Sequence, residues 1–125
     1  MASSLTYVFA LYTVVAIVSG QLLFKKISLL LDTPSIQAFL RNDGQALILL
    51  IIAFVIYSSA TVSWILALRD LPLGRSYMFM SAGFVIVPFL SQHIFGEELN
   101  GQFWIGVVLI LAGVFLTQAP DLFRS

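Results

Sequence analysis

The chain has 125 residues, of which 60% are hydrophobic and 10% are charged, and its formal net charge is zero at pH 7. Soluble domains carry about 25% charged residues, so one small core cannot bury this much apolar surface, and the composition excludes a soluble globular protein. The zero net charge argues against nucleic acid as a partner, and the lack of cysteine excludes disulfides and thiolate metal sites.

Long uncharged runs predict four membrane-spanning helices, because an α-helix needs about 20 residues to cross the hydrocarbon core. Charged or turn-forming residues separate the runs, and the predicted spans are about residues 5–24, 45–68, 76–95 and 101–119. The first run has no basic residue before it and no small-residue cleavage site after it, so we expect a retained span and not a signal peptide. Pro88 predicts a bend in the third run, with Gly83 close by.

The longest connection, between the first two spans, contains a second kind of predicted helix. The DTPS stretch at residues 32–35 is a helix start signal with proline in the first turn, and it predicts an interfacial helix at about residues 34–41. The sequence thus predicts one all-α membrane domain over residues 1–125. Its fold class is a four-transmembrane-helix bundle with short loops, one interfacial helix and both termini on the same side.

The orientation in the membrane does not follow from charge. Each side of the predicted bundle carries three basic residues, which are Arg69, Arg75 and Arg124 on the side of the termini and Lys25, Lys26 and Arg41 on the other side. The positive-inside rule therefore assigns no orientation. Three alternatives stay open: so few charges carry no information on orientation, a partner subunit fixes the orientation, or copies insert both ways and pair antiparallel.

The predicted spans hold no Asp, Glu, Lys or Arg in their interiors, and His93 lies near the end of its span. Proton-coupled transporters usually keep an ionisable residue in the membrane. The chain also has no Walker loop, dinucleotide fingerprint, metal-ligand cluster or nucleophile with a base. We therefore expect no enzymatic activity, no catalytic residue, no cofactor and no bound metal.

Uncharged polar side chains in the spans are candidates for a substrate groove. The candidate lining residues are Gln21, Tyr57, Ser58, Thr61, Tyr77 and Ser81, and the candidate basic residues at the rim are Lys25 and Arg75. A basic residue at a membrane face can bind a phosphate. Interhelical hydrogen bonding is the alternative role for the polar residues, and snorkelling is the alternative for the basic ones. Lys25 and Arg75 lie on opposite sides, so they do not meet in one subunit.

The fourth span carries a stripe of small and aliphatic residues. Gly106, Leu109, Ile110, Gly113 and Val114 follow the spacing i, i+3, i+4, i+7 and i+8, which places them on one helical face. Small residues let membrane helices approach closely, so this stripe predicts a dimer interface. The alternative is that glycine is simply common in membrane spans.

Several stretches resemble one family. The four short spans, LPLGRSY at residues 71–77 and GxxLIxxGV at residues 106–114 resemble the small multidrug resistance proteins of the drug/metabolite transporter (EamA-like) superfamily. The resemblance implies dimerisation through the last span. Drug-exporting members place a glutamate at the position of Ile17 and a tryptophan at the position of Met80. The usual exchange of protons for cations is therefore not expected here.

A subgroup without that glutamate is more similar. GQLxxK at residues 20–25 and LGxxYxxxS at residues 73–81 resemble the subunits of the aminoarabinose-phosphoundecaprenol flippase. This resemblance implies transport of a polyprenyl-phosphate-linked sugar across the bacterial inner membrane, with membrane lipid as a partner. It also implies a homodimer, parallel or antiparallel, or a heterodimer with a related small subunit. The alternatives are a small multidrug-resistance-type exporter with another coupling route and a non-transporting scaffold for a membrane enzyme.

Overall fold

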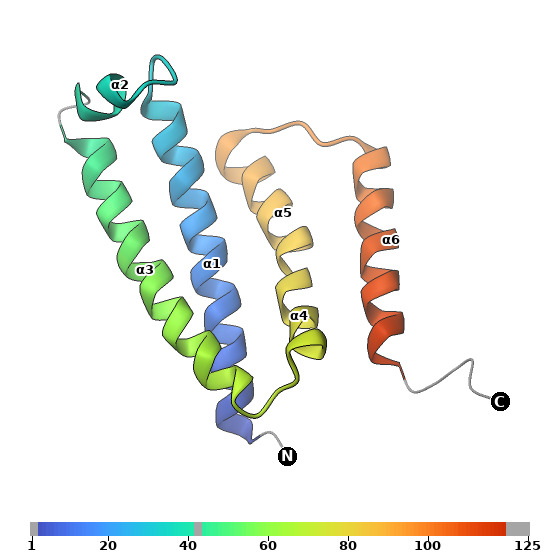
Figure 1. Ribbon diagram of the computed structural model, residues 1–125. Helices are drawn as coiled ribbons and strands as arrows, with labels where there is room; N and C mark the ends of the chain where they lie inside the picture. The colour runs from blue at the N-terminus through green and yellow to red at the C-terminus, as the bar shows by residue number, and fades with distance from the viewer. Residues whose placement is uncertain (1–2, 42–43, 120–125) are drawn as a thin grey trace.

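The computed structural model describes residues 3–41 and 44–119, so Asn42, Asp43 and the predicted basic residue Arg124 lie outside the described residues. The elements within these ranges are the helices α1 (Ser4–Leu30), α2 (Ile36–Arg41), α3 (Gln45–Leu68), α4 (Leu73–Ser81), α5 (Gly83–Phe95) and α6 (Gly101–Gln118) (Figure 1). Within residues 3–41 and 44–119, four stretches are long and apolar enough to cross a membrane: α1, α3, α4 with α5, and α6. The predicted fold class, an all-α protein with four membrane-spanning helices, is confirmed.

Helix α1 is longer than the uncharged run that predicted it. It begins after Ser3, whose hydroxyl accepts a hydrogen bond from the Thr6 N–H, and it continues to Leu30, beyond Lys25 and Lys26. Charge marks the end of an apolar run but does not break a helix. Pro34 disfavours helical backbone at the residue before it, so α1 could not have continued beyond Asp32 in any case. Both lysines therefore lie on the last turns of α1 and not in a loop.

The short helix α2 lies at the end of the bundle formed by the C-terminus of α1 and the N-terminus of α3 (Figure 1). It begins at Ile36, because the Ser35 hydroxyl accepts a hydrogen bond from the Ala38 N–H at 3.1 Å and so caps the helix. No residue of α2 is buried, and its chain contacts α3. The position at this end is where a helix that follows the membrane surface would lie.

Small side chains pack α1 against α3, and this pair makes the most extensive helix contact in the described structure. A seven-residue repeat keeps one seam of a helix facing its partner, and small residues allow close approach in lipid. Both helices carry such a repeat of buried residues. It comprises Ala46, Ala53, Ala60 and Ala67 on α3 and Thr6, Thr13, Gly20 and Ile27 on α1.

Hydroxyl groups in this seam bond across it. The Ser63 hydroxyl donates to the Phe9 carbonyl at 2.8 Å, and the Thr13 hydroxyl donates to the Ala60 carbonyl at 3.4 Å. At the end of the seam, the Thr6 hydroxyl donates to the Asp70 carboxylate at 2.8 Å. Since lipid offers no hydrogen-bond partners, these bonds stabilise the α1–α3 pair and fix the turn after α3.

The third span is interrupted at Ala82, beside Gly83 and within the stretch in which the sequence predicted a bend. The Ala82 N–H donates to the Phe79 carbonyl at 3.3 Å, and the Val85 N–H donates to the Ala82 carbonyl at 3.1 Å. These i to i+3 bonds tighten the turn between α4 and α5. Pro88 lies inside α5, which continues through it to Phe95. The helix break thus lies next to Gly83.

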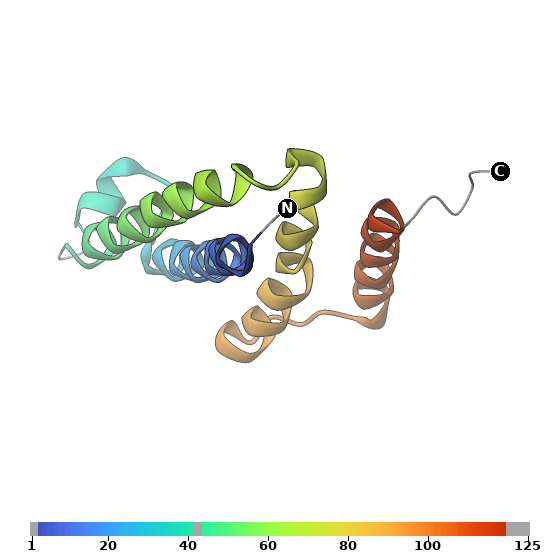
Figure 2. The ribbon, with the colours of Figure 1, turned by 90° about the horizontal axis from the view of Figure 1, so that it is seen from below.

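Helix α6 is the outermost helix. It packs on α4, and Figures 1 and 2 show it on the far side of α4 and α5 from α1 and α3. Among the residues of α6, all of which the structure describes, only Val107 is buried. Helix α6 ends at the same end of the bundle at which α1 begins (Figure 1). Most of its surface is therefore left for contact with lipid or with another protein.

Candidate functional site

A groove separates α1 from the segment formed by α4 and α5. Two adjoining cavities of about 280 and 230 Å³ form it, and they share Gln21 of α1 and Val87 of α5. Most of the other lining side chains are apolar. The groove runs from the middle of α1, at Val14, to the end of the bundle at which α2 lies, where Lys25 forms its rim.

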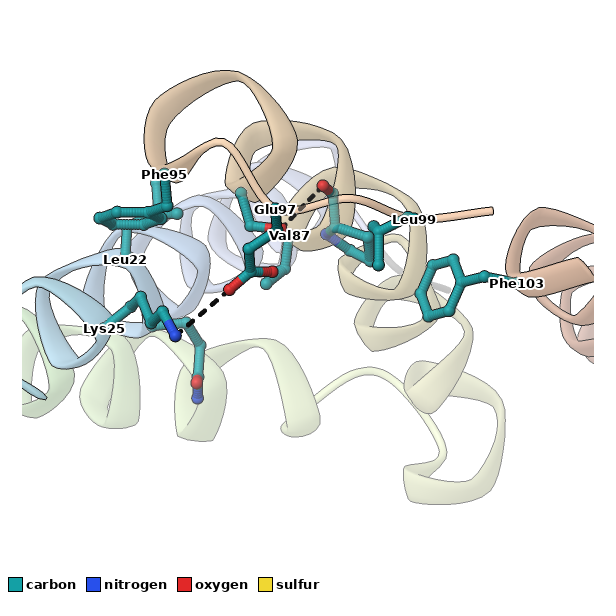
Figure 3. A pocket seen from close by; sticks show the side chains of 10 residues that line it. Leu22, Lys25, Val87, Phe95, Glu97, Leu99 and Phe103 are labelled. Carbon is teal, nitrogen blue, oxygen red and sulfur yellow. Dashed lines mark hydrogen bonds and ion pairs between the residues drawn. The ribbon is translucent and has the colours of Figure 1, made fainter. Parts of the chain in front are cut away.

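An ion pair closes the rim of the groove. The Lys25 Nζ lies 3.3 Å from Oε1 of Glu97, and their side chains are 42% and 38% exposed (Figure 3). Lys25 comes from α1 and Glu97 from the link between α5 and α6, so the pair spans the groove. Gly96 fixes this geometry because its φ of 68° ends α5 in the left-handed region that favours glycine. The Glu97 N–H then donates to the Ser91 carbonyl at 3.5 Å.

Gln21 lies one helical turn before Lys25 and supplies the polar group deeper in the groove. Its Nε2 donates to the Tyr57 hydroxyl at 2.9 Å, which links the groove to α3. The Phe24 ring stacks on the Tyr57 ring, with 5.2 Å between the ring centroids. Gly20 lies against the same ring, and a Cβ at Gly20 would overlap Cε2 of Tyr57. The Gln21 side chain is therefore held by the Tyr57 ring, and that ring is in turn held by its packing against Phe24 and Gly20.

The other predicted lining residues lie away from this groove. Ser58 and Thr61 are exposed on α3, and the Thr61 hydroxyl donates to the Tyr57 carbonyl of its own helix at 2.8 Å. On α4, Tyr77 is 62% exposed and its ring meets the Trp64 ring edge-on.

Ser81, also on α4, is buried, and its hydroxyl donates to the Met78 carbonyl. Of the predicted polar set, the structure thus brings Gln21 and Lys25 into one groove and attaches Tyr57 to it.

Arg75 lines a different cavity, at the opposite end of the bundle. This cavity has a volume of about 310 Å³, and its polar lining residues include Asp70, Ser76 and Gln118. The linings of these two cavities, one toward each end of the bundle, therefore each include one basic and one acidic side chain. The expectation that Lys25 and Arg75 do not meet in one subunit is confirmed, because they line separate cavities.

Three of the groove residues outside the predicted site, Glu97, Ile17 and Met80, bear on what the groove can bind. The sequence signal that could have identified Glu97 is its position after Gly96, at the membrane face that also carries Lys25. Ile17 and Met80 were singled out only as departures from the drug exporters, and both line the groove. The positions at which the resemblance places the exporters' glutamate and tryptophan are thus groove positions, and both are apolar in this chain.

The predicted interface stripe on α6 is not covered within the subunit. Leu109 is 67% exposed and Ile110 43% exposed, and Gly113 is exposed as well, whereas Gly106 and Val114 are half-buried. A Cβ at either glycine would meet no atom within 4 Å. Packing inside one subunit therefore does not explain why this face carries glycine.

Comparisons with known proteins agree with the resemblance. The chain matches the EamA-like transporter family over residues 1–118. It is 33% identical over 102 residues to the probable 4-amino-4-deoxy-L-arabinose-phosphoundecaprenol flippase subunit ArnF of Pseudomonas fluorescens (strain Pf0-1). The matched stretch covers 76% of this chain and 72% of that protein. It is 31% identical over 99 residues to the probable ArnE subunit of Salmonella paratyphi C (strain RKS4594), covering 79% of this chain and 84% of that protein.

A third relative matches over a shorter stretch. The probable ArnE subunit of Pectobacterium atrosepticum is 36% identical over 69 residues, which cover 55% of this chain and 61% of that protein. No solved structure gives a significant match. With its four apolar spans and its bacterial relatives, the chain is a multi-pass protein of the bacterial inner membrane. The chain belongs to the EamA-like transporter family.

Proposed function

We propose that the protein is a subunit of a flippase that moves a polyprenyl-phosphate-linked sugar across the inner membrane. The observation that carries this proposal is the groove between α1 and α5, with Lys25 at its rim and Gln21 one turn deeper. A flippase moves a polar phosphosugar head while the lipid tail stays in hydrocarbon. A cation at the rim attracts the phosphate, and an amide can hydrogen-bond sugar hydroxyls.

The apolar residues of the groove favour this substrate over a cationic drug. Ile17 and Met80 line the part of the groove nearer the bilayer centre. A cation in that place would have no carboxylate as a partner, and an unpaired charge is costly in the membrane. A lipid-linked sugar bears its negative charge at the phosphate, and Lys25 meets that charge at the membrane face.

The transport test compares reconstituted vesicles with empty ones. A short-chain prenyl-phosphate-linked aminoarabinose is placed in the outer leaflet, and periodate, which does not cross the membrane, oxidises the sugar that stays outside. Vesicles containing the protein, co-purified with whichever related subunit accompanies it, are expected to protect a growing share of the sugar. Equal protection in empty vesicles would refute the proposal.

Pairing through α6 completes the proposed transporter. We propose that the stripe of Gly106, Leu109, Ile110, Gly113 and Val114 packs against the last helix of a second small subunit, either a copy of this chain or a related one. The open space beside the two glycines supports this, since membrane helices associate through packing of small residues. The relatives are named as flippase subunits, which also supports a partner.

Enlarging the stripe is expected to weaken this pairing. Gly113→Leu places a bulky side chain where two backbones would approach, so recovery of an epitope-tagged second subunit should fall severalfold, since overpacking costs about 1–3 kcal/mol. Ala112→Leu is the matched control, because Ala112 is exposed on another face of α6. Co-purification is measured for a second copy and for the related subunit. Equal recovery with both variants would show that another surface forms the interface.

A further inference from the structure

The rim of the groove carries two opposite charges, and the proposed function uses only one of them. We infer that Glu97 is a specificity-determining residue: Lys25 binds the phosphate of the headgroup, and Glu97 binds an amine on its sugar. Glu97 would then favour a headgroup with both an ammonium and a phosphate over an anionic sugar phosphate that lacks the amine. This inference rests on the proposed function, because it concerns the same groove.

Separating Lys25 from Glu97, so that each can bind part of a headgroup, costs little free energy. The two charged atoms of the pair are 3.3 Å apart, and both side chains are more than one-third exposed, so water and ions already screen the attraction. Exposed pairs of this kind contribute about 0.2–1 kcal/mol. A headgroup that carries both a phosphate and an ammonium gives each side chain a new partner. No charge at the rim is then left unpaired.

A headgroup that carries only a phosphate would leave one charge at the rim without a partner. It would draw Lys25 away from Glu97 and leave the carboxylate without its cation, next to the incoming negative charge. Like charges at this distance repel, and an unpaired charge beside an apolar groove is unfavourable. Glu97 therefore selects by repulsion of the wrong headgroup as well as by attraction of the right one.

The backbone around Glu97 holds the carboxylate at this place. Gly96 adopts its left-handed conformation just before it, and the Gln92 Nε2 donates to the Leu99 carbonyl at 3.4 Å just after it. Figure 3 shows the side chains of Lys25 and Glu97 pointing toward each other at the mouth of the groove. A fixed loop keeps the carboxylate beside the groove even when Lys25 turns toward a phosphate.

The opposite end of the bundle has the same pair of charge types. Asp70 and Arg75 both line the cavity there, and Asp70 is positioned by the hydrogen bond from the Thr6 hydroxyl at 2.8 Å. A headgroup that reaches that membrane face thus meets one carboxylate and one guanidinium again. Charges of both signs at both faces fit a zwitterion better than an anion.

Binding to two probes tests the inference. The purified protein in phosphatidylethanolamine–phosphatidylglycerol nanodiscs is titrated calorimetrically with a short-chain prenyl-phosphate-linked aminosugar and with its N-acetylated form, which has lost the positive charge. The wild type is expected to prefer the amino probe about fivefold to tenfold, the effect of one partly exposed charged contact. Glu97→Gln should abolish this preference, and Glu97→Asp should keep most of it. Glu98→Gln is the matched control, since Glu98 is exposed and does not line the groove.

The outcomes separate the two proposals. If the wild type binds both probes equally, or if Glu97→Gln keeps the full preference, Glu97 does not select the amine and the proposed function still stands. If the wild type binds neither probe, the proposed function itself falls. If Glu97→Gln binds neither probe and Glu97→Asp does not restore the preference, Glu97 only shapes the rim, and the inference is overturned.

Discussion

Lys25→Gln is expected to lower transport of a prenyl-phosphate-linked sugar by roughly tenfold to a hundredfold, because a hydrogen bond to a charged group contributes about 1.5–3 kcal/mol. Lys25 is the basic residue that lines the groove, and its ammonium lies at the rim. Glutamine keeps a polar side chain of similar reach but cannot attract a phosphate by charge. The measurement is the initial rate of sugar protection in reconstituted vesicles, at matched protein content.

The neighbouring lysine provides the control for this prediction. Lys26 is exposed on α1 and does not line the groove, and both lysines lie near the same membrane face. Lys26→Gln therefore removes an equal charge from that face and is expected to change the rate by less than about twofold, the effect of a snorkelling side chain. Equal losses in the two variants would mean that the surface charge, and not the site at Lys25, governs transport.

The four spans were predictable because lipid imposes a simple rule on sequence. A segment that crosses the bilayer needs a long run without charge, and the runs in this chain end at obvious charged turns such as Arg69 and Asp70. The ends of the helices were less predictable. Helix α1 continues past Lys25 and Lys26 to Leu30, because charge changes the environment that a residue prefers and not its ability to be helical.

The seam between α1 and α3 was present in the sequence but was not identified. Ala46, Ala53, Ala60 and Ala67 recur every seven residues, and such a repeat predicts a helix-packing face. The glycines of the last span were identifiable because residues without a side chain are distinct from the large aliphatic residues around them. Alanine is common in apolar helices, so an alanine by itself does not indicate a packing face. Only the seven-residue repeat of these alanines indicates one.

The residues of the candidate site that lie on one helix were predictable from the sequence. The residue that helix packing brings to the site was not. Gln21 and Lys25 are one helical turn apart, so their shared face follows from the sequence alone. Glu97 reaches the same groove from the link after α5, and only the packing of α5 on α1 brings it to Lys25. Residues such as Thr61 and Ser81 bond to carbonyls of their own helices, which sequence cannot distinguish from lining a groove.

Gly20→Ala is expected to destabilise the protein by about 1–3 kcal/mol, although alanine is the better helix former by about 1 kcal/mol. The added Cβ would overlap Cε2 of Tyr57. That ring cannot simply turn away, since it stacks on Phe24 and accepts a hydrogen bond from Gln21. Moving it weakens both contacts, so the loss exceeds the gain in helix propensity. The midpoint of thermal unfolding in detergent should fall accordingly, and Gln21 should lose its fixed position in the groove.

Two further variants show whether the Tyr57 ring is the cause. Gly74→Ala makes the same change in α4, where a Cβ would meet nothing within 4 Å, so its unfolding midpoint should stay level or rise. Tyr57→Ala removes the obstructing ring, and adding Gly20→Ala to it should then cost little further stability. Such non-additivity is the sign of two residues in direct contact. If Gly20→Ala lowered stability equally with and without the Tyr57 ring, α1 would require glycine at this position for another reason, and the ring would not be what anchors Gln21.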